Sequence, residues 1–222
     1  MNIRMENIRK NYTESGVETN VLQGVDLDVK SGEMVSVMGA SGSGKSTLLY
    51  IIAGLEQASS GKLYADDREM IGLKKSEADH YRRGHIGMVF QQFALVPYYT
   101  VFENVELPLR VQGVSRRERK DKVMELLRSL GIEELCKKRP SKLSGGEQQR
   151  CAIARAIAAS DDLILADEPT GALDRNTGYE VMGVLRSLKE QGKTIILVTH
   201  DREIAGFSDR ILCMRDGKIY EE

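Results

Sequence analysis

The sequence has no tryptophan, four phenylalanines, four prolines and only three cysteines in 222 residues. Cys136, Cys151 and Cys213 are far apart and form no Cys-x-x-Cys pair. This excludes a disulfide framework and a cysteine-based zinc site, and it is typical of reduced thiols in a cytoplasm. No run approaches the roughly 18 apolar residues of a membrane-spanning helix, and the first residues lack the apolar segment of a signal peptide. We therefore expect a cytosolic globular protein.

Charge of neither sign prevails, because 32 Lys and Arg residues stand against 33 Asp and Glu residues. A balance of this kind argues against nucleic acid as a partner, since such proteins gain most of their affinity by neutralising phosphates. Hydrophobic residues make up 41% and charged residues 29%, which is ordinary for a globular fold. The length fits one α/β domain with an inserted subdomain.

Short apolar runs rich in strand-forming residues lie at 33–38, 163–166 and 194–199. Runs of this kind are typical of parallel strands that are buried on both faces and joined by crossover helices. They predict an α/β fold with a mostly parallel sheet flanked by helices. We expect the nucleotide-binding core to consist of residues 1–91 and 161–222.

The stretch 92–160 is more charged and predicts a helical subdomain inserted into this core. Ser115 and Glu118 have the spacing of a capping box, apolar residues follow at helical intervals, and Gly131 ends the helix. Near the end of the chain, residues 210–219 have the pattern of a β-hairpin with an Asp-Gly turn. The whole chain is thus expected to form a single domain.

Residues 39–47 match the pattern Gly-x-x-x-x-Gly-Lys-[Ser/Thr] between an apolar strand and an apolar helix at 48–55. Glycines allow backbone N–H groups to surround a phosphate chain, and the helix N-terminus adds positive potential. We expect Lys45 to contact the β- and γ-phosphates and Ser46 to bind Mg²⁺. The expected nucleotide-binding residues of this loop are Gly39, Ala40, Ser41, Gly42, Ser43, Gly44, Lys45, Ser46 and Thr47.

A second buried strand ends in two carboxylates, Asp167 and Glu168. The carboxyl end of such a strand faces the ligand crevice of an α/β sheet. Asp167 is suited to the Mg²⁺ shell through water, and Glu168 is suited to orient and deprotonate an attacking water. This adjacency favours hydrolysis over phosphoryl transfer to a bulky acceptor.

Residues 143–150 read Leu-Ser-Gly-Gly-Glu-Gln-Gln-Arg. Ser144 and Glu147 alone make an ordinary capping box. Two consecutive glycines, Gly145 and Gly146, are costly near a helix start unless something approaches the backbone closely. A γ-phosphate on the helix N-terminus is such a group.

With this motif the chain resembles the ATP-binding-cassette (ABC) ATPases over essentially its whole length. The resemblance implies that Tyr12 stacks on adenine and that Gln91, in the glutamine loop, touches Mg²⁺ and links catalysis to the membrane partner. It also implies that Asp174 belongs to a loop crossing between two subunits. His200 matches the switch histidine that contacts the γ-phosphate. These motifs occur in the order typical of the family.

In this family two cassettes pack head to tail, with ATP between the phosphate-binding loop of one and the signature of the other. The resemblance therefore implies a homodimer in which Ser144, Gly145 and Gly146 serve the partner's nucleotide. The expected cofactors are ATP and Mg²⁺, with Ser46, Gln91 and Asp167 at the metal. The expected catalytic residues are Lys45, Gln91, Glu168 and His200.

Two segments indicate the branch of the family. Residues 166–174, with Gly171, and residues 103–109 resemble the branch of macrolide exporters, lipoprotein-releasing systems and antimicrobial-peptide resistance transporters. Polar amino-acid importers share Val-Phe-Gln-Gln-Phe at 89–93 but usually have Ser at the position of Gly171. A cell-division cassette is a further alternative, and the lack of a regulatory domain after residue 222 disfavours sugar importers.

Because the chain has no apolar span, we expect a separate integral membrane permease to form the transport pathway. The chain would then be cytoplasmic and peripheral on the inner face of the cell membrane. The family places the region 93–107, with Tyr98 and Tyr99, in the groove that receives the permease. Two alternatives from other classes are a small-molecule kinase, which has no use for the signature glycines, and a soluble cassette without a transporter.

Overall fold

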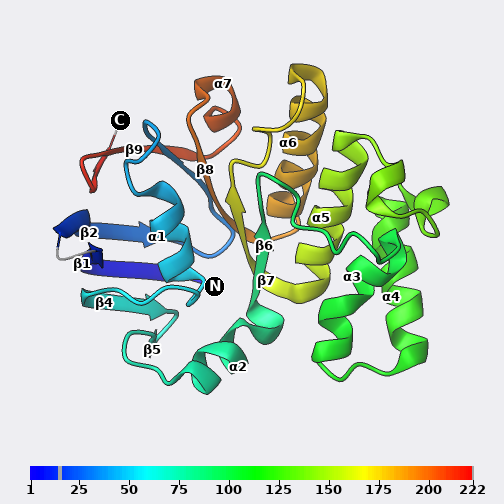
Figure 1. Cartoon of the computed structure of the whole chain (residues 1–222), viewed down its shortest axis with the longest axis horizontal. Coiled ribbons are helices and arrows are strands. Elements are labelled where there is room, and N and C mark those ends of the chain that lie inside the picture. Colours follow the sequence, from blue (N-terminus) through cyan, green and yellow to red (C-terminus); the bar gives the residue numbers. More distant parts are fainter. Residues whose placement is uncertain (15–16, 222) are drawn as a thin grey trace.

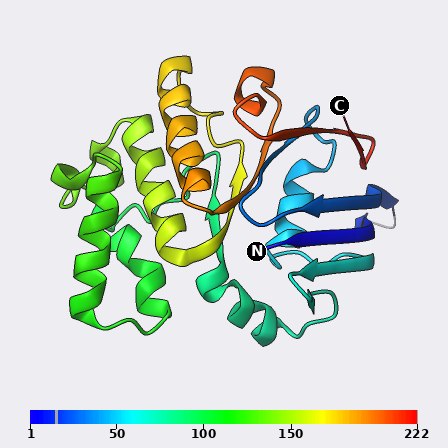
Figure 2. The same ribbon diagram turned by 180° about the vertical axis from the view of Figure 1, so that it is seen from behind.

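Two β-sheets and a group of helices lie side by side in the computed structural model, which describes residues 1–14 and 17–221. The small sheet, which contains the N-terminal strand, and the helical group occupy opposite ends of the molecule, and the large sheet lies between them (Figures 1 and 2). The large sheet has the strand order β10-β9-β3-β8-β7-β6, and the small sheet has the order β2-β1-β4-β5.

The large sheet is parallel in β9, β3, β8, β7 and β6, and β10 pairs antiparallel to β9. Every residue of β8 is buried, as expected for a strand covered on both faces. The strands are β3 (Met34–Met38), β6 (Ile86–Val89), β7 (Ser160–Asp167), β8 (Thr194–Thr199), β9 (Arg210–Arg215) and β10 (Lys218–Glu221). Helices around it are α1 (Lys45–Ile52), α2 (Lys75–His85), α6 (Arg175–Glu190) and α7 (Arg202–Ala205).

The small sheet is antiparallel throughout. Its strands are β1 (Ile3–Glu14), β2 (Val17–Val29), β4 (Ser60–Ala65) and β5 (Arg68–Glu69). Inward side chains of this sheet, among them Ile3, Met5 and Leu63, share one buried cluster with Leu48 and Ile52 of α1. This packing fixes the small sheet against the helix that follows β3.

The helical group shares a buried cluster with the large sheet and α6. Val105, Val123, Leu127 and Ile153 pack there with residues such as Ile164 of β7 and Leu197 of β8. The helices of this group are α3 (Val101–Val111), α4 (Arg116–Ser129), α5 (Gly145–Ala159) and the short 3₁₀ helices Glu133–Leu135 and Pro140–Lys142. Capping boxes begin α3, α4 and α5, at Thr100, Ser115 and Ser144. Each satisfies backbone N–H groups that the first turn leaves without partners.

The α/β fold, the buried parallel strands and the helix that begins after Ser115 are confirmed. The C-terminal hairpin is confirmed as well, and both residues of its turn, Asp216 and Gly217, have positive φ, at 48° and 70°. The helix after the phosphate-binding loop ends at Ile52, three residues earlier than expected, because the chain turns at Gly54 with φ 63°.

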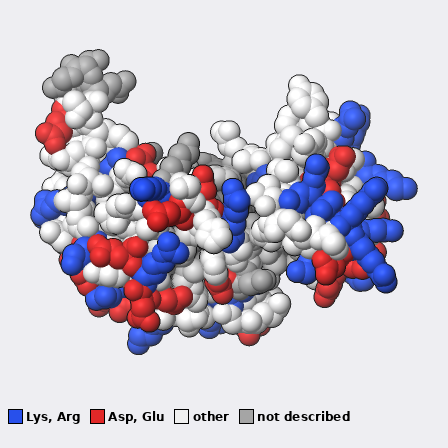
Figure 3. Space-filling view, turned by 90° about the horizontal axis from the view of Figure 1, so that it is seen from below, with Lys and Arg blue, Asp and Glu red and all other residues white. Residues whose placement is uncertain are grey.

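Basic side chains gather at the end of the molecule that α3 and α4 form (Figure 3). Arg110, Arg116 and Lys120 line a cavity of about 900 Å³ there. Glu106 lines it too and pairs with Arg119 at 2.8 Å, so both signs of charge are present on this surface. Within the described parts of the chain, no helix combines the length and the apolar character needed to cross a membrane.

Candidate active site

The loop between β3 and α1 has the conformation that a phosphate-binding loop requires. Gly44, the N-cap of α1, has φ 103°, in the left-handed region that glycine adopts at little cost. Among the described residues, no side chain caps this helix start. The first N–H groups of α1 are therefore available to an anion, which the helix dipole also favours.

The side chains of Lys45 and Ser43 show that the loop suits a phosphate chain. The ammonium of Lys45 is nearly buried and donates to the carbonyl oxygens of Gly39 and Ala40, at 2.7 and 2.9 Å. In the described structure the buried hydroxyl of Ser43 has no hydrogen-bond partner. A cation held over the loop and an unpaired hydroxyl within it fit a ligand with several anionic oxygens.

The end of β7 brings a carboxylate to the start of α1. Ser46 Oγ donates to Asp167 Oδ1 at 2.9 Å, and the Tyr50 hydroxyl donates to Asp167 Oδ2 at 3.1 Å. Burial, together with the charge of Asp167 and this hydrogen bond, raises the pKa of Tyr50, which therefore stays a donor. One carboxylate and one hydroxyl beside a phosphate loop fit Mg²⁺, which commonly takes few protein ligands and completes its shell with phosphates and water.

Glu168 and His200 form a pair at the carboxyl ends of β7 and β8. His200 Nδ1 lies 3.0 Å from both carboxylate oxygens of Glu168. The Glu168 backbone has φ 48°, a left-handed conformation that is rare outside glycine. Its N–H donates to the Val198 carbonyl oxygen at 3.0 Å, which ties this residue to β8.

These groups converge on one cavity of about 810 Å³. Its lining consists of Val21, Ala40, Ser41, Gly42, Gly44, Lys45, Ser46, Thr47, Gln91, Asp167, Glu168 and His200. Gly39 and Ser43 line a neighbouring cavity. A Cβ on Gly171 would lie 2.7 Å from Gln91 Nε2, so the absence of a side chain there makes room for Gln91. This contact gives a steric reason for Gly171, the residue that helped to indicate the branch of the family in the sequence.

The signature residues do not line this cavity. Ser144 caps α5: its Oγ accepts from the Glu147 N–H at 3.3 Å, and its own N–H donates to Glu147 at 2.7 Å. A Cβ on Gly146 would meet Thr177 Cγ2 at 2.5 Å, so the close approach at this glycine comes from the chain itself. Asp174 caps α6 and accepts from the Thr177 N–H at 3.1 Å.

Tyr12 also lies outside the cavity lining. It belongs to β1, and 39% of its surface is exposed. The structure therefore divides the sequence-predicted residues into a converged group around the phosphate-binding loop and residues that lie outside this cavity, namely Tyr12, residues 144–146 and Asp174.

Two side chains that were not predicted from the sequence, the buried Asn104 and the half-buried Arg155, organise the glutamine loop. Asn104 is fully buried; its amide donates to the carbonyl oxygens of Val96, Tyr99 and Thr100. Arg155, on α5, donates to the carbonyl oxygens of Ala94 and Phe93 at 2.6 and 2.9 Å. Composition and periodicity carry no signal for either contact, since both depend on how distant segments pack.

Arg155 holds a turn of unusual conformation. Phe93 and Ala94 have φ 60° and 49°, and two consecutive left-handed residues other than glycine cost about 1–3 kcal/mol each. Burial lowers the pKa of Arg155, which still stays far above neutral pH because guanidinium is not deprotonated in proteins. The bonds from Arg155 therefore stabilise a backbone that would otherwise relax.

We expect Arg155→Leu to lower the free energy of unfolding by about 2–4 kcal/mol, because two carbonyl groups lose a charged donor. Hydrogen exchange should rise at residues 91–95 before it rises in β7. The control is Arg128→Leu, whose exposed pair with Glu133 should leave the free energy of unfolding nearly unchanged. Equal urea midpoints for the two variants would contradict this role of Arg155.

A strand, a glycine-rich loop and a helix, with an acidic strand end beside them, define a P-loop nucleotide-binding domain. The family model described as ABC transporter matches residues 22–171. The macrolide export ATP-binding/permease protein MacB of Pasteurella multocida is 44% identical over 98% of this chain and 33% of that protein. The Shigella flexneri MacB protein is 42% identical, over 98% of this chain and 34% of that protein.

Solved structures agree with this assignment. The dimeric bacterial ABC transporter cassette MJ0796 is 44% identical, with a TM-score of 0.92, over 99% of this chain and 97% of that chain. A second dimeric MJ0796 structure, in a post-hydrolysis state bound to ADP and Pi, is 43% identical, with a TM-score of 0.91. The chain belongs to the ABC transporter family as an ATP-binding cassette, which confirms the resemblance found in the sequence. It spans about a third of the length of the curated relatives it matches.

Proposed function

We propose that the chain binds ATP with Mg²⁺ and hydrolyses it to power a membrane permease, in export or in mechanical work outside the cytoplasm. The observation that carries this proposal is the convergence of Lys45, Asp167 and Glu168 on one cavity. The export branch is supported by the MacB relatives, which are export proteins. The amino-acid importer and cell-division alternatives have no comparable support.

The phosphate side of the site is built for binding and charge stabilisation. Lys45 exchanges its carbonyl partners for β- and γ-phosphate oxygens, and N–H groups at the start of α1 bind the same chain. Ser46, Asp167 and Gln91 would hold Mg²⁺, which supplies neutralisation of the charge that develops on the phosphates.

Hydrolysis follows from the position of Glu168. Its carboxylate accepts a proton from water while the water oxygen bonds to the γ-phosphorus and the bond to the bridging oxygen of ADP breaks. His200, at 3.0 Å from both carboxylate oxygens, orients Glu168 and contacts the γ-phosphate. Most of the rate enhancement comes from positioning and electrostatics.

The signature acts on a second copy of the chain. Ser144, Gly145 and Gly146 lie outside the cavity that holds Lys45, and MJ0796 is dimeric. A head-to-tail homodimer brings the signature of one copy to the phosphate loop of the other, with Asp174 near the crossing between them. In this arrangement residues 92–160 form the helical subdomain, and residues 1–91 and 161–222 form the core.

The permease contacts the loop that follows the glutamine loop. Tyr98 is 81% exposed, although the loop that carries it is fixed by the buried Asn104. An exposed aromatic side chain on a fixed loop is typical of a protein interface. The cassette then works on the cytoplasmic face of the membrane through this contact.

We expect a tagged Glu168→Gln chain, incubated with MgATP in membranes of the source cells, to co-purify with one or two integral membrane proteins. In the export branch these have few spans and a large extracytoplasmic domain. Adding Tyr98→Glu should reduce their recovery roughly tenfold, because an aromatic anchor is lost, while ATP affinity stays unchanged. Quantitative mass spectrometry of the eluates measures the recovery.

The matched control is Tyr220→Glu, which changes another exposed tyrosine, on β10. Recovery that falls equally with both variants contradicts docking at Tyr98. A permease with many spans, of the importer kind, contradicts the export branch. Recovery of soluble partners alone contradicts the transport role but not the proposed ATP hydrolysis.

A further inference from the structure

Lys10, on β1, is a nearly buried cation that the catalytic scheme does not use. It is 9% exposed, and its ammonium donates to Glu56 Oε1 at 2.7 Å and to the Gln57 carbonyl oxygen at 2.8 Å. The same ammonium lies 4.6 Å from the centre of the Tyr12 ring. A buried ammonium needs such partners to offset its lost hydration.

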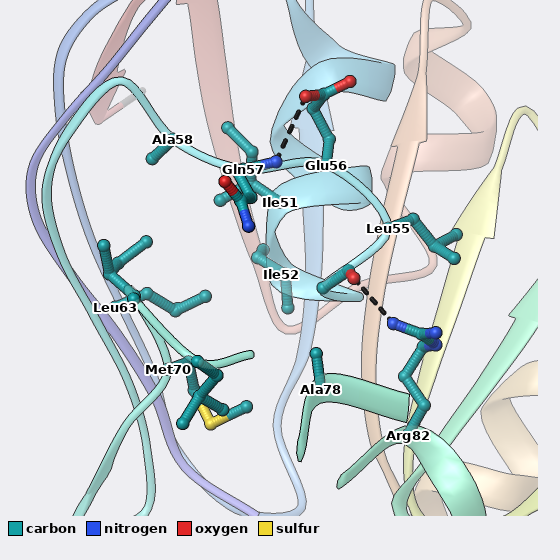
Figure 4. Close-up of a pocket in the computed structure, with 14 residues that line it drawn as sticks. Ile51, Ile52, Leu55, Glu56, Gln57, Ala58, Leu63, Met70, Ala78 and Arg82 are labelled. Carbon is teal, nitrogen blue, oxygen red and sulfur yellow. Dashed lines mark hydrogen bonds between the residues drawn. The ribbon is translucent and has the colours of Figure 1, made fainter. Parts of the chain in front are cut away.

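Glu56 fixes this cation to the end of the phosphate-binding helix. Its carboxylate accepts from the Gln57 N–H at 3.1 Å, as Figure 4 shows, and its own N–H donates to the Tyr50 carbonyl oxygen at 3.1 Å. The hydrogen bond from Lys10 is the main cause that lowers the pKa of Glu56. Glu56 thus stays ionised and holds the Lys10 ammonium.

Tyr12 is therefore held through Lys10, whose ammonium lies over its ring. Part of the ring surface remains exposed. A cation on one face of an aromatic ring leaves the opposite face free to stack, and the attraction is strongest where the cation is desolvated. Glu56 lies just beyond α1, and its N–H bond to the Tyr50 carbonyl oxygen ties it to that helix, so α1 connects the Lys10–Glu56 pair with the phosphate-binding loop.

We propose that Lys10 and Glu56 are positioning residues that hold the Tyr12 ring as a platform for the nucleotide base. This inference rests on the proposed contact between Tyr12 and adenine. The pair contributes to base affinity, whereas the loop at residues 39–47 binds the phosphates. The two contributions separate when ATP is compared with tripolyphosphate, which has no base.

Calorimetric titration of the full chain with ATP and with tripolyphosphate tests this inference. We expect Lys10→Met to weaken ATP binding about three- to tenfold, the effect of losing a partly desolvated cation–π contact. Tripolyphosphate affinity and kcat at saturating ATP should stay at the wild-type level. Lys10→Arg should restore most of the ATP affinity, and Lys62→Met, at an exposed lysine of β4, is the matched control.

Tyr12→Ala separates failure of the inference from failure of the adenine contact. If Tyr12→Ala weakens the binding of ATP but not of tripolyphosphate, while Lys10→Met behaves as wild type, the positioning role is overturned and the adenine contact stands. If Tyr12→Ala changes neither titration, the adenine contact fails and the inference falls with it. If Lys10→Met weakens the binding of ATP and of tripolyphosphate equally, Lys10 supports the fold only, which also overturns the inference.

Discussion

Glu168→Gln should reduce the rate of ATP hydrolysis by about 10²–10⁴-fold, the contribution of a positioned general base. The amide keeps the size of the side chain but does not accept a proton at neutral pH. His200 Nδ1 lies 3.0 Å from both carboxylate oxygens, so the substituted side chain keeps a partner in place. ATP affinity should therefore remain, since Lys45 and the loop around it are unchanged.

Phosphate release and equilibrium ATP binding measure the two properties separately. The control is Glu190→Gln at the end of α6, whose exposed pair with Arg186 is long, at 3.9 Å. That variant should hydrolyse ATP at the wild-type rate. Hydrolysis by Glu168→Gln near the wild-type rate would exclude Glu168 as the base and would leave His200 as the candidate for that role.

The phosphate-binding loop and the acidic strand end were predictable because short stretches of sequence define them. Residues 39–47 carry their conformation in the residue types, and both flanking elements are strongly apolar. Asp167 is the last residue of a strand that is buried on both faces, so its place at the sheet edge is determined by the strand alone. Local chemistry and sheet geometry agree at these positions.

The contacts of Arg155 and Lys10 were not predictable, because they join segments that are far apart in the sequence. Arg155 contacts residues 61 and 62 positions away, and Lys10 contacts Glu56 across 46 positions. Alone in a sequence, each is a charged residue that is usually exposed. Tyr98 was singled out in the sequence only through the family resemblance, and its exposure depends on the loop that Asn104 fixes. Such contacts depend on tertiary packing, which hydrophobic periodicity does not record.

A composite active site makes a second strong prediction, which concerns mixtures of variants. Lys45→Ala removes the cation that we propose binds the phosphates, and Gly145→Asp places a negative charge at the helix start that we propose faces the partner's nucleotide. Each homodimer then loses both sites, and we expect ATPase activity to fall roughly 10²-fold or more. Gly145→Asp should still fold, because a Cβ there would meet Leu173 Cδ2 at 3.2 Å, a side-chain end that can shift.

Mixing the two variants should restore activity. In a mixed head-to-tail dimer one site combines both defects, and the other combines an intact phosphate loop with an intact signature. Random pairing makes half of the dimers mixed, so equal amounts should regain about a quarter of wild-type sites. Phosphate release measured across mixing ratios should therefore peak at equal amounts. A flat line at the level of the single variants would show either that signature and loop act within one chain or that one intact site cannot turn over alone. Adding excess Lys45→Ala to the wild type separates these cases, because it lowers wild-type activity only if both sites of a composite dimer must be intact.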